Sequence, residues 1–386
     1  MSTPTAIYLD NHATTRCDPR VVEAMLPFFT EEYGNAASRS HGFGYRAKRA
    51  VEDARASIAR HLGCSPKEVL FTSGATESNN LAILGCVRAH GASGSHVVTV
   101  ATEHKAVLDP VHQLEREGAS VTVLTVGEDG LVSAEQVADA IRSDTVLVSV
   151  MAVNNEIGVQ HPLEAIGEVC RDRGVAFHCD AAQAAYRPID VRDASIDLLS
   201  LSAHKIYGPK GIGALFVRRG RPRLSLEPLM HGGGHERGLR SGTLPVPSIV
   251  GLGRAVSLLG DSAERERVTA LRDTLLTALA SLPGVTVNGS MNHRAPNNLN
   301  VSFSGIEAEA LLLALKGVAV STGSACTSAT IEPSHVLRAL GLSDDRAHGA
   351  LRFGLGRFTT AEEITDVSRR IVEKVDMLRA LNADTL

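Results

Sequence analysis

The apolar residues in the first two thirds of this chain gather in short continuous runs rich in Val, Ile and Leu. These runs lack polar alternation, which is typical of strands covered on both faces. They alternate with helix-like segments, and this order predicts a mainly parallel sheet in an α/β layer fold. We expect strands at 67–72, 96–101, 119–126, 145–151, 175–180 and 196–202, with helices at 78–90 and 105–118.

The pattern changes after about residue 258, where long amphipathic stretches predominate. With 386 residues the chain is too long for one typical core, so this segment predicts a second, smaller α+β domain. We expect the first residues of the chain to pair with it. The predicted domains are 16–258 (large) and 1–15 with 259–386 (small), the latter containing helices at 263–282, at 307–316 and from about 360, and a strand within 297–305.

Composition and charge exclude several classes of function. The net charge is −4, aromatic residues make up 4% and Trp is absent, so neither a polyanion-binding surface nor a stacking platform for nucleic acid is expected. The N-terminus lacks a signal-peptide pattern, and no apolar run is long enough to span a membrane. The six cysteines show no CxxC spacing, which argues against a zinc knuckle or a disulfide framework. We therefore expect a cytoplasmic protein.

Two glycine-rich stretches match known functional motifs, but the sequence around them does not support either function. "HGFGYRA" (41–47) contains GxGxxA, but no strand precedes it, so a dinucleotide site is not expected. "MHGGGHERGLRSGT" (230–243) has an esterase-like HGGG, but the chain has no GxSxG nucleophile motif. A metal held by His231, His235 and Cys326 is a poorly supported alternative, and no metal site is predicted.

"FTSGATESNN" (71–80) reads as a strand, a turn of small residues and the start of a helix. Backbone N–H groups at a helix N-terminus, with the hydroxyls of Ser73, Thr76 and Ser78, could cradle a phosphate. Plain helix capping explains the same residues equally well. The stretch alone leaves both interpretations open.

Three residues at predicted strand ends favour the cofactor interpretation. Asp180 ends one strand, Lys205 follows the next, and His104 follows a third, so all three should reach the crevice at the carboxyl edge of the sheet. Pyridoxal phosphate needs an amine for its aldehyde, a carboxylate for its ring nitrogen, donors for its phosphate and a planar group over its ring. Taken singly, Lys205 would be a surface lysine and Asp180 a cap, whereas together they predict a pyridoxal phosphate site.

The sequence resembles the cysteine desulfurases of the IscS/NifS type, in the class V aminotransferase family. Matching stretches occur in the family's order along nearly the whole chain. They are "YLDNHATT" (8–15), "FTSGATESNN" (71–80), "TEHKAVLD" (102–109), "VNNEIGV" (153–159), "HCDAAQ" (178–183), "SAHKIYGPKGIGAL" (202–215), "MHGGGHERGLRSGT" (230–243), "STGSACTSA" (321–329) and "LRFGLGRFTT" (351–360).

The resemblance implies fold type I of the pyridoxal phosphate enzymes, with a mainly parallel seven-stranded sheet in the large domain. It implies that Lys205 bonds covalently to the cofactor and that His104 stacks on its ring. Asp180 would pair with the ring nitrogen, and Gln183 would bond the ring hydroxyl.

The resemblance also assigns the remaining binding residues. Asn155 would contact the cofactor and, with Arg352 in bidentate fashion, the substrate carboxylate. Thr243 would reach the phosphate of a neighbouring subunit, which makes 230–243 a dimer-interface segment. The phosphate in the chain's own site would be held by Ala75, Thr76, Ser202 and His204.

Cys326 lies in a run of small residues that reads as an exposed loop, at about 321–333, within the small domain. The resemblance implies that its thiolate takes sulfur from L-cysteine, giving L-alanine and a persulfide. The sulfur would pass to an acceptor, such as a scaffold protein for iron–sulfur cluster assembly, and Cys326 could briefly ligate a cluster. A homodimer is expected.

Two alternatives to a cysteine desulfurase are a selenocysteine lyase and a non-catalytic sulfur-carrier scaffold. The scaffold is disfavoured because the predicted catalytic residues are all present. The chain ends soon after its last predicted helix, without the tail by which IscS-like members dock the cluster scaffold, so docking of that kind is not assured here.

Overall fold

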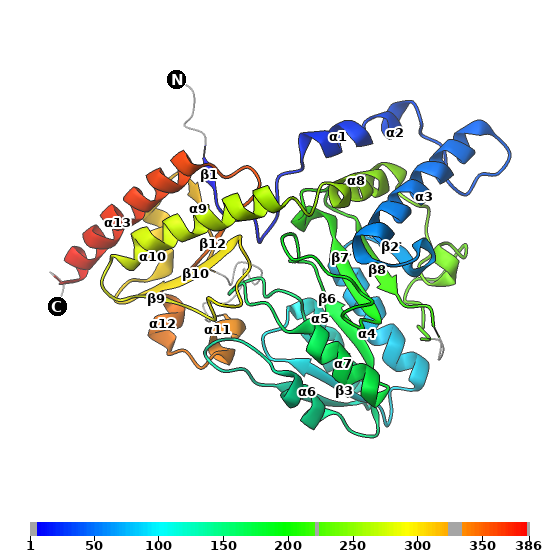
Figure 1. Cartoon of the computed structure of the whole chain (residues 1–386), viewed down its shortest axis with the longest axis horizontal. Coiled ribbons are helices and arrows are strands. Elements are labelled where there is room, and N and C mark those ends of the chain that lie inside the picture. The colour runs from blue at the N-terminus through cyan, green and yellow to red at the C-terminus, as the bar shows by residue number, and fades with distance from the viewer. Residues whose placement is uncertain (1–5, 221–223, 323–333, 384–386) are drawn as a thin grey trace.

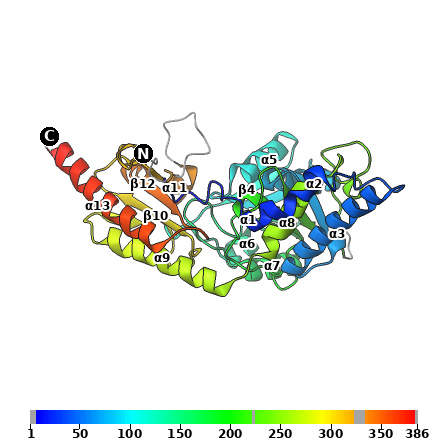
Figure 2. The same cartoon turned by 90° about the horizontal axis from the view of Figure 1, so that it is seen from above.

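The computed structural model describes residues 6–220, 224–322 and 334–383. Figure 1 shows a larger lobe around a central sheet and a smaller lobe that holds both ends of the described chain, and Figure 2 shows the two lobes side by side. In the described part of the chain, no helix combines the length and apolar character needed to cross a membrane.

The larger lobe is built on a seven-stranded sheet with strand order β2-β8-β7-β6-β5-β3-β4. The pairs from β7 to β4 are all parallel, whereas β8 runs antiparallel to both of its neighbours. The predicted fold class is thereby confirmed. The strands are β2 (Val69–Thr72), β3 (His96–Val100), β4 (Ser120–Leu124), β5 (Thr145–Ser149), β6 (Ala176–Asp180), β7 (Leu198–Ser202) and β8 (Gly213–Val217).

Apolar runs form this sheet because helices cover both of its faces. Leu147 and Leu198 point to a cluster containing α4 (Ala75–His90) and α5 (Lys105–Arg116), while their neighbours Val148 and Leu199 point to the opposite cluster. All four side chains are fully buried. The opposite face is covered by α3 (Gly42–Leu62), α6 (Ala134–Ala140), α7 (Leu163–Arg173) and α8 (Val246–Ser257).

The smaller lobe has a three-stranded antiparallel sheet, in the order β12-β10-β9. The N-terminal strand β1 pairs in parallel with β11. Helix α8 packs on α1 (Pro19–Met25) and on α3 of the larger lobe, whereas α9 packs on α13. This change of partner supports the predicted boundary near residue 258, which stays a prediction. The bounds are β1 (Ile7–Tyr8), α9 (Ser262–Ala280), β9 (Val285–Val287), β10 (Asn298–Phe303), α10 (Ala308–Ala314), β11 (Val318–Ala319), α11 (His335–Ala339), α12 (Asp344–His348), β12 (Ala350–Gly354) and α13 (Ala361–Ala383).

The GxGxxA stretch at 41–47 forms the first turn of α3, with His41 as its N-cap. It follows the short helices α1 (Pro19–Met25) and α2 (Pro27–Thr30), and it does not follow a strand. The sequence match to a dinucleotide motif therefore has no βαβ context here.

A buried ion pair joins α3 to the loop at 230–243. Glu236 accepts hydrogen bonds from both terminal nitrogens of Arg55, each at 2.8 Å, and from the backbone N–H of Phe71 at 2.9 Å. Both charged side chains are almost fully buried, at 5% and 3% exposure, and the Arg55 guanidinium lies 4.6 Å from the centre of the Phe71 ring.

Glu236→Gln is expected to lower the free energy of unfolding by about 3 kcal/mol, because it removes the buried counter-ion of Arg55 and leaves only the half-exposed Glu52 beside that charge. Chemical denaturation measures this loss. Asp53→Asn on the same helix is the matched control. It breaks the exposed Arg49–Asp53 pair and should cost less than about 0.5 kcal/mol. Equal losses in the two variants would contradict the role given to the buried pair.

Candidate functional site

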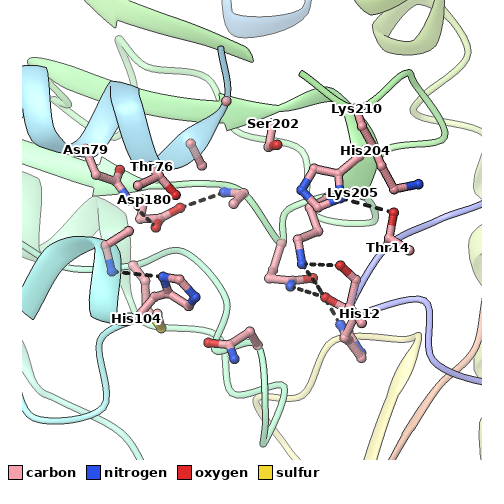
Figure 3. A pocket seen from close by; sticks show the side chains of 18 of the residues that line it. His12, Thr14, Thr76, Asn79, His104, Asp180, Ser202, His204, Lys205 and Lys210 are labelled. Atoms are coloured by element: carbon pink, nitrogen blue, oxygen red, sulfur yellow. Dashed lines mark hydrogen bonds between the residues drawn. The ribbon is translucent and has the colours of Figure 1, made fainter. Parts of the chain in front are cut away.

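A cavity of about 710 Å³ opens where the carboxyl ends of the parallel strands meet. Figure 3 shows that Thr76, Asn79 and Asp180 lie together on one side of it, while Lys205, His204, Thr14 and His12 lie on the other. The structure thus brings together nearly all the residues that the sequence singled out. The predicted residues that line the cavity are Ala75, Thr76, His104, Asn155, Asp180, Gln183, Ser202, His204, Lys205 and Arg352.

The N-terminus of α4 forms one wall of this cavity. Gly74 is its N-cap residue, which has no side chain to accept a hydrogen bond from the first turn of the helix. Its free N–H groups and positive dipole end suit an anion. Gly213 keeps this wall compact, because a Cβ there would lie 2.6 Å from the Cα of Gly74.

The hydroxyls near this helix end divide into two groups. Ser73, Thr76 and Ser202 line the cavity. The phosphate-binding interpretation, which the sequence left open, does not extend to Ser78, since its side chain is fully buried and its hydroxyl lies 2.7 Å from that of Thr72. Residue 78 falls on the inward face of α4, where it holds the helix to β2 instead of facing a ligand.

Asp180 ends β6 and is held from two directions. Its Oδ1 accepts a hydrogen bond from the backbone N–H of Ala182 at 2.9 Å. Its Oδ2 accepts one from Nδ2 of Asn79 at 2.6 Å, across from α4. These bonds fix the carboxylate at the cavity wall with only 6% exposure.

Lys205 lies in a short 3₁₀ turn, Ala203–Lys205, that follows β7. Its Nζ donates to the backbone carbonyls of His12 and Ala13, at 2.5 and 2.8 Å. This half-buried lysine is thus bonded to the turn that follows the N-terminal strand β1. The next turn is strained, because Tyr207 has φ of 66°, a left-handed conformation that bulky residues rarely adopt.

The N-terminal segment holds this turn in place. Thr15 donates its N–H to the carbonyl of His204 at 2.8 Å and accepts from the N–H of Tyr207 at 2.8 Å. The Tyr207 carbonyl accepts the N–H of Asp18 at 2.9 Å. Residues distant in the chain therefore fix the position from which Lys205 enters the cavity.

Three imidazoles of the cavity are kept neutral by burial. Burial lowers the pKa of His12 to about 3 and that of His204 to about 4, and nearby positive charges add to both shifts. Burial also lowers the pKa of His104, whose Nδ1 accepts the N–H of Ala106 at 3.0 Å and so caps α5. Because that nitrogen is an acceptor, the single ring proton of His104 lies on Nε2.

Arg352 on β12 carries its charge into the cavity from the smaller lobe. Its side chain is 2% exposed, and its terminal nitrogens donate to Oδ1 of Asp10 at 2.8 Å and to the carbonyl of Asn155 at 2.9 Å. Within the described residues, Nε of Arg352 and Oδ1 of Asn155 are buried without a hydrogen-bond partner. Both residues line the cavity, so a ligand bound there could supply the missing partners.

Several residues that were not predicted from the sequence also belong to this site. His12 lies 3.0 Å from Gln183 through Nδ1, and Thr14 lies 3.1 Å from His204. Glu77 accepts from Arg240 at 2.8 Å, and its carboxylate also accepts the N–H of Ser73 at 2.7 Å. The strongest signal for the first pair was the motif at 8–15, to which no role had been assigned.

One predicted residue that the structure describes does not join the cavity. Thr243 is exposed and is not among the residues lining it. Cys326 lies outside the described residues, as does most of its predicted loop. In the ranges that the structure covers, no cluster of His, Cys, Asp or Glu suits a metal ion, and this includes His231 and His235.

The five described cysteines are poor candidates for a nucleophile. Burial raises the pKa of Cys17, and it raises the pKa of Cys64, Cys86 and Cys170 to about 12. The pKa of Cys179 is also raised well above its usual value by burial. Each thiol therefore stays protonated near neutral pH, whereas catalysis requires a thiolate.

The cavity fits pyridoxal phosphate on the chemistry of its walls. An uncapped helix end faces one region, a fixed carboxylate and a lysine amine face each other across it, and buried polar atoms near Arg352 lack partners. These are the groups that the phosphate, the ring nitrogen, the aldehyde and a bound amino acid require.

Comparisons with known proteins agree with this chemistry. The family model for Aminotransferase class-V matches residues 7–367. A protein named cysteine desulfurase IscS, from Anaeromyxobacter sp. (strain Fw109-5), is 59% identical over 380 residues, covering 97% of this chain and 94% of that protein. The solved structure of a NifS-like protein has a TM-score of 0.89 at 36% identity, covering 96% of this chain and 100% of that one. A structure of SspA in complex with cysteine has a TM-score of 0.82 at 39% identity, covering 92% of this chain and 100% of that one. Since these matches extend over nearly the whole chain, the chain belongs to the class V aminotransferase family.

Proposed function

We propose that this chain is a pyridoxal phosphate-dependent cysteine desulfurase, which converts L-cysteine to L-alanine and transfers the sulfur to its own Cys326. The observation that carries this proposal is the cavity with Asp180 on one side and Lys205 on the other (Figure 3), which Arg352 of β12 also lines. The curated relatives described above bear the name of this activity, and one structural neighbour holds cysteine.

The residues of the cavity suit each part of the cofactor. We assign the phosphate to the N-terminus of α4 with Ala75 and Thr76, and to Ser202 and His204. Asp180 would pair with the ring nitrogen, Gln183 would bond the ring hydroxyl, and His104 would lie against one ring face. Asn155 would also contact the cofactor. When bound, pyridoxal phosphate supplies an aldehyde that captures amines and a protonated ring that withdraws electrons from the substrate Cα.

The chain's own residues then bind and deprotonate the substrate. Arg352 receives the carboxylate of L-cysteine, and Asp10 with the Asn155 carbonyl holds the guanidinium in position. With pyridoxal phosphate bound, Lys205 would hold its aldehyde, and Nζ of Lys205 would serve as the base that takes the proton from the substrate Cα. Nδ1 of His104 accepts the N–H of Ala106, so the ring proton lies on Nε2. Nε2 is therefore the ring nitrogen that can donate to a ligand in the cavity.

Sulfur transfer balances without an external oxidant. The Cys326 thiolate attacks the substrate sulfur, the S–Cβ bond breaks with its electrons left on the substrate carbon, and that carbon takes a proton. L-alanine leaves, and Cys326 carries a persulfide. A thiol or an acceptor protein then removes the outer sulfur, which restores the Cys326 thiol.

The face formed by α1, α2 and the start of α3 suits a second copy of this chain. Its exposed apolar side chains are Val22, Leu26, Phe29 and Tyr33, at 41%, 58%, 58% and 66% exposure. Such a patch is unusual on a monomer. In a homodimer through this face, the exposed Thr243 would be available to the neighbouring subunit's phosphate site, as the family resemblance implies. Size-exclusion chromatography with light scattering tests the assembly.

Production of alanine and sulfide from L-cysteine, in the presence of a thiol, tests the proposed activity. Purified protein with bound cofactor should form both products in equal amounts. L-selenocysteine is assayed in parallel, and a strong preference for it would make the chain a selenocysteine lyase. Bound cofactor without product from either amino acid would overturn the proposed catalytic activity.

Arg352→Lys is expected to raise the KM for L-cysteine about 10- to 100-fold, because lysine cannot bind a carboxylate with two parallel hydrogen bonds. Steady-state alanine formation measures this change. The spectral response to cysteamine, which has an amine and a thiol but no carboxylate, is the control and should stay unchanged. An unaltered KM for L-cysteine would contradict the assigned carboxylate site.

A further inference from the structure

The two carboxylate oxygens of Asp180 have partners of different origin. Oδ1 is bonded by the N–H of Ala182, which lies two residues further along the same chain segment. Oδ2 is bonded by Nδ2 of Asn79 at 2.6 Å, from a different element, α4 (Figure 3). Asn79 is fully buried, so water does not compete for this hydrogen bond.

Asn79 follows Thr76 by three residues in α4, so the two side chains project from neighbouring positions of one helix surface. Thr76 belongs to the helix end that we assign to the phosphate. Asn79 reaches the carboxylate that we assign to the ring nitrogen. One helix therefore spans the distance between two ends of the cofactor and holds a group at each.

Packing alone does not explain an asparagine at this position. Oδ1 of Asn79 is buried and has no hydrogen-bond partner among the described residues. Burying an unsatisfied amide oxygen is unfavourable, and a leucine of similar size would avoid this. Reversing the amide would not help, because it would place its oxygen against the Asp180 carboxylate.

We propose that Asn79 is a positioning residue, which holds the Asp180 carboxylate in the orientation that suits the ring nitrogen of pyridoxal phosphate. A hydrogen bond from a buried donor to a carboxylate is strong and directional, so it fixes the direction in which the carboxylate presents its oxygens. This inference rests on the proposed function, since it assumes that pyridoxal phosphate occupies the cavity.

The test compares two ligands on cofactor-free protein. One is pyridoxal phosphate, and the other is its analogue with carbon in place of the ring nitrogen. Asn79→Leu should weaken binding of pyridoxal phosphate about tenfold or more and leave binding of the analogue nearly unchanged, because the analogue cannot use the charged carboxylate. Absorbance titration measures both affinities without any turnover.

Asn80→Leu is the matched control. Asn80 is the next residue of the same helix, but its side chain donates to the carbonyl of Thr76 and does not contact Asp180. Its affinity ratio for the two ligands should equal that of the wild type. Asn79→Ala, which removes the same donor with less bulk, replaces Asn79→Leu if circular dichroism shows that the leucine variant is not folded.

Equal weakening of both ligands in the Asn79 variants, or no weakening of either, would overturn the inference. So would a wild-type protein that binds the two ligands equally well. A wild-type protein that binds neither ligand would instead show that the proposed function is wrong, so the two failures are distinguishable.

Discussion

Lys205→Ala is expected to reduce alanine formation from L-cysteine about 10³-fold or more, because it removes both the covalent attachment of the cofactor and the base at the substrate Cα. Purified Lys205→Ala should also lack the visible absorption of cofactor bound to a lysine. External amines such as methylamine can replace the lost amine in part, and partial rescue of the spectrum by methylamine would identify the missing group.

Lys210→Ala is the matched control for this variant. Lys210 lines the same cavity but is exposed and follows the turn that carries Lys205. Its removal should leave the absorption of the bound cofactor in place. A Lys205→Ala protein with normal spectrum and turnover, or a Lys210→Ala protein with neither, would contradict the assignment of the reactive amine.

Cys326→Ser is expected to reduce steady-state alanine formation on the order of 10³-fold or more, as removal of a nucleophile does in other enzymes with covalent intermediates. A serine hydroxyl stays protonated near neutral pH and is a weak nucleophile toward sulfur. The spectral change on adding L-cysteine should persist, because the groups assigned to the cofactor and the substrate carboxylate are unchanged.

Cys17→Ser provides the control for thiol loss. Cys17 is half-buried and its pKa is raised, so its replacement should leave turnover unaltered. Full activity in Cys326→Ser would refute Cys326 as the sulfur acceptor. Loss of activity in Cys17→Ser would redirect the assignment to a thiol that the structure places close to Asp18 and Lys210.

The sheet and its helices could be predicted from the sequence because each element is specified by the apolar pattern of its own residues. A strand buried on both faces must be mainly apolar, as in β7 (Leu198–Ser202), where three of the five residues are leucine, and a helix must cover each face. The ends were less accurate. The helix predicted to start at residue 78 begins at Ala75. The prediction missed this start because the N-cap residue, Gly74, has no capping side chain that would mark it in the sequence.

The residues at strand ends were predictable for a related reason. Asp180, Lys205 and His104 follow separate strands, and parallel strands bring their carboxyl ends to one edge. The cavity accordingly contains all three. Cys326 is different, since its assignment rests on the family resemblance and on the unsuitability of the described thiols.

The supporting residues could not be predicted, because their partners are distant in the chain. His12 meets Gln183 across 171 residues, and Asp10 meets Arg352 across 342. In the sequence, Asn79 is one polar residue of a predicted helix, and only the folded structure shows that it bonds Asp180. Such contacts depend on how the two lobes and their helices pack, which no local pattern encodes.

The measurement that tests the account most directly is the amount of alanine formed from excess L-cysteine when no thiol other than the substrate is added, followed on the time scale of a single turnover. The account predicts a rapid burst of alanine limited to the amount of protein, with a persulfide on Cys326, followed by slow release. The burst should be absent in Cys326→Ser. A burst of the same size in that variant, or no burst in a wild-type protein with bound cofactor, would contradict the account.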